Sequence, residues 1–143
     1  MLDKTTPDWR ALAADLEIEG RAFIEGRYRD ALAGETRATM CPADGHKLAD
    51  VANCGIEDAD RAVAIARGAF ASGIWAEMAP ADRKMVLVRW AELIEAHADE
   101  IALLECLDVG KPIANTTALD VPSAVRTIRW SGEAIDKAYD EIS

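Results

Sequence analysis

The stretch LDVGKPI, residues 107–113, decides which fold the sequence of this 143-residue chain predicts. A helical pattern that carries Glu105 and Asp108 runs into it and stops at Gly-Lys-Pro, and a further amphipathic pattern follows toward Ser143. Glycine accepts the left-handed backbone that ends many helices, and a proline soon after it cannot continue the helix. Asp108 therefore stands at a helix C-terminus, where the helix dipole disfavours a negative charge. We expect a compensating group there: Lys111, a capping contact or a cation.

Before this stretch, the sequence predicts one helix and two β-hairpins. Short apolar runs of period two flank a Glu-Gly pair and a Pro-Ala-Asp-Gly turn, in which proline fixes φ and glycine accepts positive φ. The expected elements are a helix at 7–18 ended by Gly20, strands at 21–24 and 27–30, and strands at 36–41 and 46–53 around the turn at 42–45. Two isolated hairpins have open edges and are marginal in water, so we expect other parts of a larger protein to complete them.

After Gly55 the apolar spacing changes to the helical period. One stripe consists of Ile56, Ala59, Val63, Ala66 and Phe70, and Gly73 can close that helix. Pro80 opens the next helix, whose apolar seam consists of Leu87, Ala91, Ile94, Ala98 and Ile101. The seam passes through His97, and either one long helix or two helices with a bend at His97 fit it. A last helix, with Pro122 near its start, is marked by Ala124, Ile128, Ser131, Ile135 and Ala138.

Composition excludes several classes of partner. The net charge is -10, which repels phosphate backbones and anionic lipids, so we expect no nucleic acid and no membrane as a partner. No apolar run reaches the length of a membrane-spanning helix, and the first ten residues lack the pattern of a signal peptide. The three cysteines, Cys41, Cys54 and Cys106, show no CxxC spacing, which argues against a disulfide framework and a zinc site. We expect a cytoplasmic protein.

No catalytic group emerges from the residues themselves. His97 lies nine positions before Cys106, half a turn away on a continuous helix, and Glu105 and Asp108 would oppose a thiolate, so a buried structural cysteine is the better interpretation of Cys106. Asp44 and His46 flank a glycine without a third candidate ligand nearby. Neither GxGxxG nor GxxxxGK[ST] occurs, so no phosphate-binding loop is predicted.

Eight pieces of the sequence, in order, resemble the N-terminal part of NAD(P)-dependent aldehyde dehydrogenases, with the bacterial γ-glutamyl-γ-aminobutyraldehyde type of polyamine catabolism as the best match. The pieces are RAFIEGRYRD (21–30), CPADG (41–45), DADRAVAIARGAF (58–70), Trp75, Arg83, AELIEAHA (91–98), LECLDVGKPI (104–113) and RTIRWSGEAIDK (126–137). One departure is Cys41, which stands where the family usually has asparagine before the proline. The resemblance covers nearly the whole chain.

This resemblance implies an α/β enzyme, active as a homodimer or homotetramer, that oxidises an aldehyde to a carboxylic acid with NAD(P)+. A cysteine thiolate attacks the carbonyl, hydride passes to the nicotinamide, and a glutamate-activated water hydrolyses the thioester. The family's nucleophile, general base, oxyanion asparagine and nucleotide-binding lysine all fall beyond Ser143. We therefore expect residues 1–143 to be the incomplete N-terminal part of the NAD(P)-binding domain, inactive alone.

One site carries over onto residues of this chain. Many family members hold a structural monovalent cation, Na+ or K+, by backbone oxygens at the positions of Thr39 and Met40 and by the aspartate that matches Asp108. Hard cations prefer such oxygen ligands. The alternative at Asp108 is a pairing with Lys111 or a backbone N–H. The alternative for the whole chain is a stand-alone helical interaction module without enzymatic activity.

Overall fold

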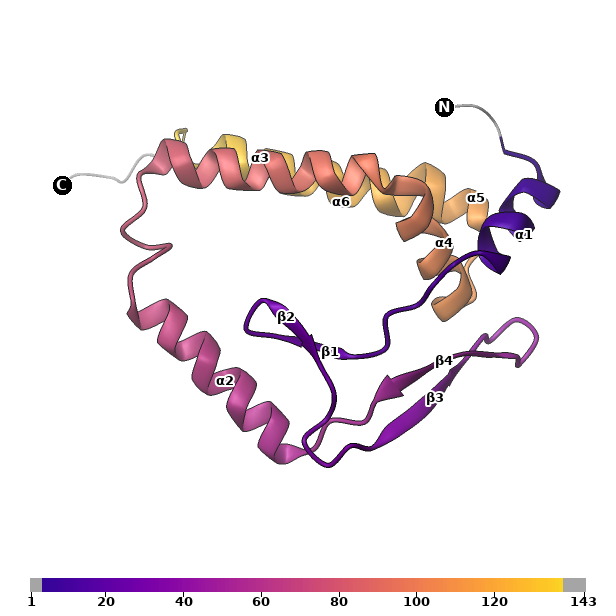
Figure 1. Ribbon diagram of the computed structural model, residues 1–143. Coiled ribbons are helices and arrows are strands. Elements are labelled where there is room, and N and C mark those ends of the chain that lie inside the picture. The colour runs from indigo at the N-terminus through magenta and orange to yellow at the C-terminus, as the bar shows by residue number, and fades with distance from the viewer. Residues whose placement is uncertain (1–3, 138–143) are drawn as a thin grey trace.

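The computed structural model describes residues 4–137 as short strands and longer helices arranged around an open centre (Figure 1). In chain order the elements are α1 (Thr6–Ala14), β1 (Ala22–Ile24), β2 (Arg27–Arg29), β3 (Thr36–Met40), β4 (Lys47–Ala52), α2 (Ile56–Ala71), α3 (Pro80–Ala96), α4 (Ala98–Val109), α5 (Ile113–Asn115), the π-helix η1 (Thr116–Asp120) and α6 (Val121–Ala134).

Both expected hairpins are present, each as a separate two-stranded antiparallel sheet. In the first, Glu25 and Gly26 have φ values of 60° and 73°, the backbone of the tightest hairpin turns. Phe23 pairs with Tyr28 across this hairpin, and their rings meet edge to face at 5.2 Å. Local turn chemistry was enough to place these strands.

The second hairpin, β3–β4, contains a register shift. Thr39 pairs with Ala49, whereas Met40 pairs with Lys47, so Leu48 is an extra residue on β4. Such a bulge disrupts the ladder locally and bends the strand. The irregularity therefore falls at two of the residues expected to bind a cation.

The first helix is shorter than expected, because it ends at Ala14 and not at Ile18. Its start is fixed by Asp8, whose carboxylate accepts a hydrogen bond from the Thr5 backbone at 2.7 Å. Gly20 does not end the helix. Its backbone lies so close to β4 that an added Cβ would be 2.1 Å from the Asp50 carbonyl oxygen, and its own carbonyl accepts the Ala52 N–H at 2.7 Å. Gly20 is there to allow this close approach.

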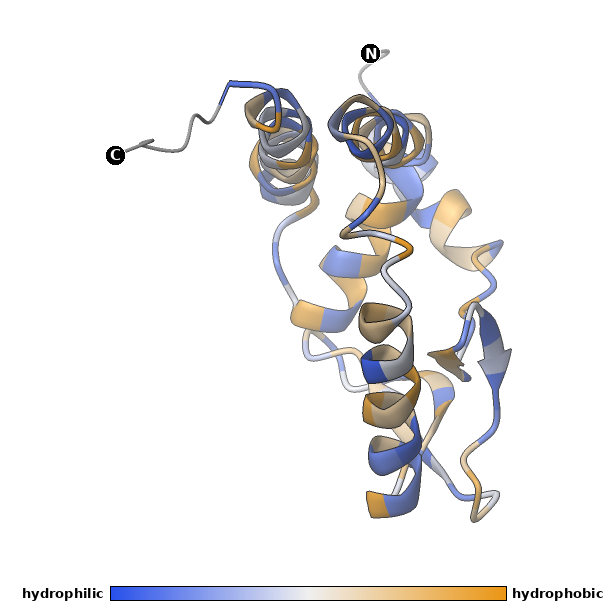
Figure 2. Ribbon diagram, turned by 90° about the vertical axis from the view of Figure 1, so that its left-hand side faces the viewer, coloured by the Kyte–Doolittle hydropathy of each residue, from blue (hydrophilic) through white to orange (hydrophobic). Residues whose placement is uncertain are grey.

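The helices α3 and α6 lie side by side and form the best-packed part of the chain (Figures 1 and 2). Ala91 of α3 and Val125 of α6 are buried, and Gly132 lets α6 approach α3, since a Cβ there would lie 3.2 Å from that of Leu87. Lys84 of α3 forms ion pairs with Glu133 of α6 (3.1 Å) and with Asp136, just after the end of α6 (3.0 Å). Small residues and complementary charges together fix this pair.

The long seam of the sequence is divided into two helices at His97, whose φ of -106° and ψ of 22° break the helical backbone between α3 and α4. This is the second of the two alternatives that the sequence left open. Gly110, with φ 78°, then ends α4 as expected. The short α5 and the π-helix η1 were not foreseen. Thr116, which is buried, donates a hydrogen bond to the Ile113 carbonyl there at 3.0 Å. Of the residues expected in the last helix, Ala138 lies outside the described residues.

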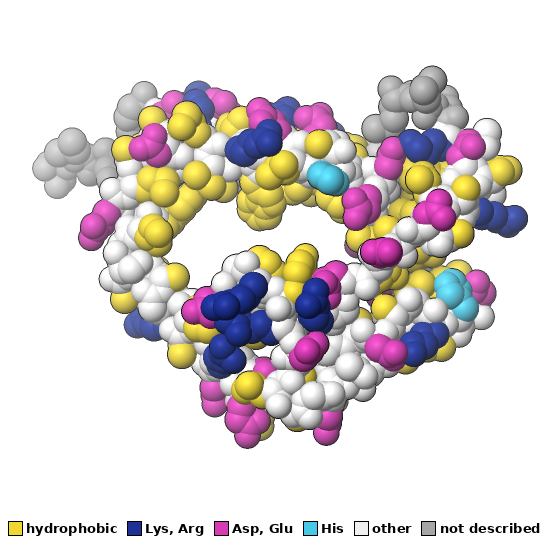
Figure 3. Space-filling model, in the orientation of Figure 1, with side chains coloured by type: hydrophobic (Ala, Val, Ile, Leu, Met, Phe, Trp, Pro, Cys, Tyr) yellow, Lys and Arg dark blue, Asp and Glu magenta, His cyan; other side chains and the backbone are white. Residues whose placement is uncertain are grey.

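Much apolar surface faces solvent. The chain exposes 10422 Å2, whereas a compact folded monomer of 15.5 kDa exposes about 7,200 Å2. Figure 3 shows hydrophobic side chains along the margin of the open centre. The exposed large ones are Leu12, Phe23, Tyr28, Leu32, Met40, Ile56, Val63, Phe70, Ile74, Trp75, Met85, Val86, Trp90, Leu93, Val109, Leu119 and Trp130. Within residues 4–137, no helix has both the length and the apolar character needed to cross a bilayer.

Candidate functional site

The structure brings together two of the three residues expected to hold a cation. Thr39 lies on β3 and Asp108 in the last turn of α4, yet the Thr39 hydroxyl donates a hydrogen bond to Asp108 Oδ1 at 3.2 Å. Gly110 ends the helix beside them, with its N–H bonded to the Cys106 carbonyl at 3.0 Å. Residues 69 positions apart in sequence thus meet where the helix dipole leaves a carboxylate in need of a partner.

Lys111 is engaged elsewhere. Its ammonium group lies 2.7 Å from Asp120 and 3.8 Å from Glu105, and hydrogen bonding to Asp120 raises the pKa of Lys111. The compensating contact to Asp108 in the structure is therefore the Thr39 hydroxyl, which is neutral. The sequence did not reveal Asp120 as the partner of Lys111, because the two are joined only through the unexpected turns of α5 and η1.

Met40, the third expected ligand residue, follows Thr39 directly at the register shift of the hairpin. A thioether is a poor ligand for a hard cation, so Met40 would contribute its backbone carbonyl, as the family resemblance implies. Thr39 and Asp108 line an open cleft of about 620 Å3 between the hairpins and α4, together with Leu48 and Ile101. Cation binding itself stays a prediction.

A pair of opposite charges, Glu19 and Arg21, lines the same cleft. The Arg21 guanidinium lies 2.6 Å from the Glu19 carboxylate and lowers the pKa of Glu19 to about 2. Glu19 therefore stays ionised over the whole physiological range. The pair belongs to the chain segment between α1 and β1.

Cys106 is partly buried, and burial raises the pKa of its thiol. His97 is turned to Glu100, with Nδ1 3.3 Å from Oε2. A thiol with a raised pKa and no adjacent base is a poor nucleophile. The geometry agrees with the structural role expected for Cys106.

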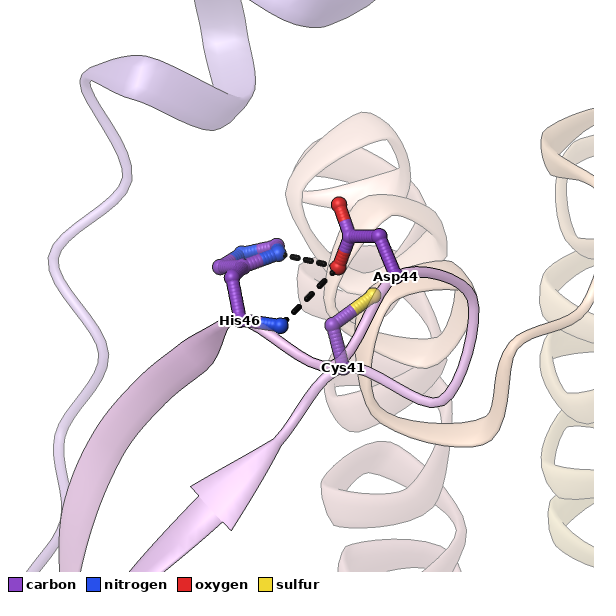
Figure 4. Close-up of side chains that lie close together, drawn as sticks. All are labelled: Cys41, Asp44 and His46. Carbon is purple, nitrogen blue, oxygen red and sulfur yellow. Dashed lines mark hydrogen bonds and ion pairs between the residues drawn. The ribbon is translucent and has the colours of Figure 1, made fainter.

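The turn at 42–45 holds a cluster that the sequence analysis underestimated. Asp44 and His46 were expected to lack a third ligand, but the thiol of Cys41 joins them, and the three potential ligand atoms lie within 4.8 Å of one another (Figure 4). Hydrogen bonding from His46 lowers the pKa of Asp44. The signal was in the sequence, since Cys41 is only three positions before Asp44. The spacing Cys-x-x-Asp-x-His is not a CxxC pattern, so CxxC spacing does not reveal this cluster.

Comparison with known proteins gives a consistent result. The model of the aldehyde dehydrogenase family matches residues 28–143. The aminoacetaldehyde dehydrogenase of Pseudomonas aeruginosa is 49% identical over 133 residues, which are 93% of this chain and 27% of that enzyme. The present chain therefore spans about a quarter of the length of this relative.

Two solved structures have the same backbone arrangement. One is the P. syringae indole-3-acetaldehyde dehydrogenase AldA in complex with NAD+ and IAA, with a TM-score of 0.95 and 52% identity over 99% of this chain and 28% of that one. The other is the γ-glutamyl-γ-aminobutyraldehyde dehydrogenase of Burkholderia cenocepacia, with a TM-score of 0.94 and 53% identity over 96% of this chain and 28% of that one.

These matches confirm the fold expected from the sequence: mixed α/β, with a helix, two hairpins and then the helices of the aldehyde dehydrogenase scaffold. They also confirm the resemblance to enzymes of the γ-glutamyl-γ-aminobutyraldehyde type. Half of the sequence or more is identical over nearly the whole chain in both solved structures. The chain belongs to the aldehyde dehydrogenase family.

Proposed function

We propose that this chain is the N-terminal part of the NAD(P)-binding domain of an enzyme that oxidises an aminoaldehyde to a carboxylic acid. The observation that carries the proposal is the similarity, at about half identity over nearly all of the chain, to enzymes named for aminoacetaldehyde and for γ-glutamyl-γ-aminobutyraldehyde. The complete enzyme would work in the cytoplasm as a homodimer or homotetramer.

The exposed apolar surface supports this assignment. The chain exposes about 3,000 Å2 more total surface than a compact monomer of the same mass, and large hydrophobic side chains such as Phe70 and Trp130 contribute to it. Apolar area removed from water contributes about 25 cal/mol per Å2, so covering the apolar part of this surface with further protein would be favourable. The open edges of the two hairpins would be paired in the same way.

The chemistry is assigned to other parts of such an enzyme. Among the described residues, Cys106 has a raised thiol pKa and no adjacent base, and the sequence has no glycine-rich phosphate loop. The residues at hand therefore do not fit a nucleotide site, and no catalytic step is assigned to them. Their role would be to support the fold of the cofactor-binding domain.

The test is a steady-state assay of NAD(P)H formation with an aminoaldehyde. A longer protein that carries this sequence should reduce the cofactor. The purified 143-residue chain should give only the background rate of NAD(P)H formation measured in buffer without protein. A chain of 143 residues that turns over an aminoaldehyde would disprove the assignment of the chemistry to other parts. A longer protein that oxidises other aldehydes but no aminoaldehyde would contradict the substrate class alone.

We also propose that the carbonyl oxygens of Thr39 and Met40 and the carboxylate of Asp108 bind Na+ or K+ as a structural ion. The contact between Thr39 and Asp108 gathers oxygen donors, and the register shift at Met40 loosens the ladder there. Oxygen-only donors suit a hard cation. The ion would neutralise the carboxylate at the unfavourable end of α4.

The ion can be tested with Asp108→Asn in the complete enzyme. The amide keeps the size of the side chain and an acceptor for Thr39 but removes the charge. The melting temperature should fall more in sodium or potassium buffer than in a buffer of a bulky organic cation. Equal decreases in melting temperature in the two buffers would contradict cation binding, and the Thr39 hydroxyl would then be the partner of Asp108.

The alternative is an interaction module without enzymatic activity. In that case the same exposed apolar residues would form its docking surface. Sedimentation of the purified chain separates the two. A stable complex with another protein, in the absence of any longer enzyme that carries the sequence, would favour the module. A chain that only aggregates or unfolds by itself would favour the enzyme.

A further inference from the structure

We propose that Cys41, Asp44 and His46 form a binding site for a transition-metal dication, for which Zn2+ is the best fit. The three residues belong to the turn that joins β3 to β4, and their side chains gather on one side of it (Figure 4). The site lies next to the place proposed for the monovalent ion, but its donor atoms differ in kind.

The geometry of the turn holds the ligands in place. The His46 backbone N–H donates to Asp44 Oδ1 at 3.1 Å, and His46 Nδ1 lies 2.5 Å from the same oxygen. The Cys41 sulfur joins them, and all three potential ligand atoms lie within 4.8 Å of one another. Small rotations of two exposed side chains would bring them to the distances of a tetrahedral ion, about 2.0–2.3 Å from each ligand.

Backbone hydrogen bonds hold the turn in one conformation. Cys41 and His46 are joined by a hydrogen bond of 2.8 Å from the Cys41 N–H to the His46 carbonyl, and the Gly45 N–H donates to the Cys41 carbonyl at 2.8 Å. Gly45 takes a φ of 75°, which glycine adopts without strain. Little backbone freedom would therefore be lost when an ion binds.

The three ligand residues differ in burial, and this difference would leave the site accessible to an ion from solvent. Cys41 is only 4% exposed, and its thiol is directed at the Asp44 carboxylate. The side chains of His46 and Asp44 are 53% and 63% exposed. An ion could enter from solvent, take the buried sulfur as one ligand, and keep water in the remaining coordination position.

The donor set selects the metal. A thiolate and an imidazole are poor ligands for Na+, K+, Mg2+ and Ca2+, which prefer oxygen, and good ligands for Zn2+ and its spectroscopic substitute Co2+. The carboxylate completes three protein ligands, the number found in zinc sites that keep an open position. Binding would release the proton of the Cys41 thiol to solvent.

The chain offers matched controls. His97 and Glu100 form a similar exposed pair of imidazole and carboxylate, with Nδ1 3.3 Å from Oε2, but no thiol belongs to that pair among the metal-binding groups of residues 4–137. Cys54 is an exposed free thiol outside the cluster. His97→Ala and Cys54→Ala therefore remove the same functional groups without touching the proposed site.

The experiment is a titration of the purified, reduced protein with Co2+, followed by displacement with Zn2+. Absorption from thiolate-to-cobalt charge transfer should appear with one ion per chain and vanish when Zn2+ is added. Cys41→Ala should abolish this absorption, and His46→Ala should raise the Kd at least about tenfold. His97→Ala and Cys54→Ala should titrate like the unmodified protein.

Cys41 is buried, so Cys41→Ala could disturb folding. His46→Ala changes only an exposed side chain and decides the question in that case. A second measurement is the labelling of Cys41 by iodoacetamide, mapped by mass spectrometry, which Zn2+ should slow in the unmodified protein and not in His46→Ala. The proposal fails if no thiolate absorption appears, if the Kd is unchanged in His46→Ala, or if Cys54→Ala removes the signal.

Discussion

The helix pair α3–α6 and the helix α2 show that apolar helix faces can be covered in one part of the molecule and exposed in another. In the pair, Ala91 and Val125 are buried, and α3 and α6 pack against each other. In α2, the stripe residues Ile56, Val63 and Phe70 are 79%, 68% and 72% exposed. A helical stripe predicts that a face needs cover, but it does not say which part of the molecule supplies the cover.

The two regions are also held by different forces. Packing of small apolar residues and inter-helix ion pairs join α3 to α6. The start of α2 is held by one buried carboxylate, Asp58, which accepts hydrogen bonds from the N–H groups of Leu32 and Gly55 at 3.0 Å each. The sequence analysis did not single out this residue for such a role.

The largest loss of stability is expected from Asp58→Ala, which leaves two backbone N–H groups without an acceptor. Since each unsatisfied group costs about 1–3 kcal/mol, the free energy of unfolding should fall by about 3 kcal/mol. Asp60→Ala, on an exposed position of the same helix, should change it by less than about 0.5 kcal/mol. Urea denaturation followed by circular dichroism measures both, and equal losses would contradict the anchoring role of Asp58.

Next in size is a matched pair of valine truncations. Val125→Ala removes buried methyl groups between α6 and its neighbours and should cost about 2 kcal/mol, whereas Val63→Ala, on the exposed stripe, should cost less than about 0.5 kcal/mol. The same pair in a longer protein sharpens the comparison. If further chain covers α2, the cost of Val63→Ala should rise toward that of Val125→Ala, and an unchanged small cost would show that the stripe stays exposed.

Replacing a glycine by alanine should change stability in opposite directions in α2 and in α6. Gly68 in α2 has open space around it, so Gly68→Ala should stabilise the protein by about 0.5–1 kcal/mol through helix propensity. A Cβ added at Gly132 in α6 would lie 3.2 Å from the Cβ of Leu87, so Gly132→Ala should destabilise the protein by about 1 kcal/mol through overpacking. Thermal unfolding of the two variants measures the difference, and stabilisation by both would mean that α3 and α6 are less closely packed.

The smallest expected effect on stability comes from the ion pairs of Lys84. Ion pairing with Lys84 lowers the pKa of Asp136, and pairing with Lys137 and Lys84 lowers the pKa of Glu133. Groups with lowered pKa contribute stability that is present above their ordinary values of 3.8 and 4.5 and is lost as the pH falls through the lowered values.

The difference in melting temperature between the unmodified protein and Lys84→Met should therefore be largest near neutral pH and shrink below pH 4. Salt should reduce it as well, because these side chains are partly exposed. Arg89→Met removes a pair within α3 and serves as the control. A difference that is independent of pH would assign the effect of Lys84 to packing of its methylene groups.

Turn and cap chemistry explain what the sequence predicted well. The turns at 25–26 and 42–45 and the helix end at Gly110 depend on residues adjacent in sequence, and all are present, whereas the break at His97 was one of two alternatives that the sequence left open. The resemblance to aldehyde dehydrogenases, carried by eight ordered pieces, predicted the fold and suggested Thr39 and Asp108 as neighbours, which the structure brings into contact.

Contacts between distant residues were decided only by the tertiary structure. The approach of Gly20 to Asp50, the pairing of Lys111 with Asp120 and the bonds of Asp58 to Leu32 each need a particular path of the chain, which local propensity does not specify. The cluster of Cys41 with Asp44 and His46 lies between these cases: its residues are adjacent, but only the turn geometry brings the sulfur to the carboxylate. Local sequence fixes backbone dihedrals, whereas burial and pairing depend on which surfaces meet.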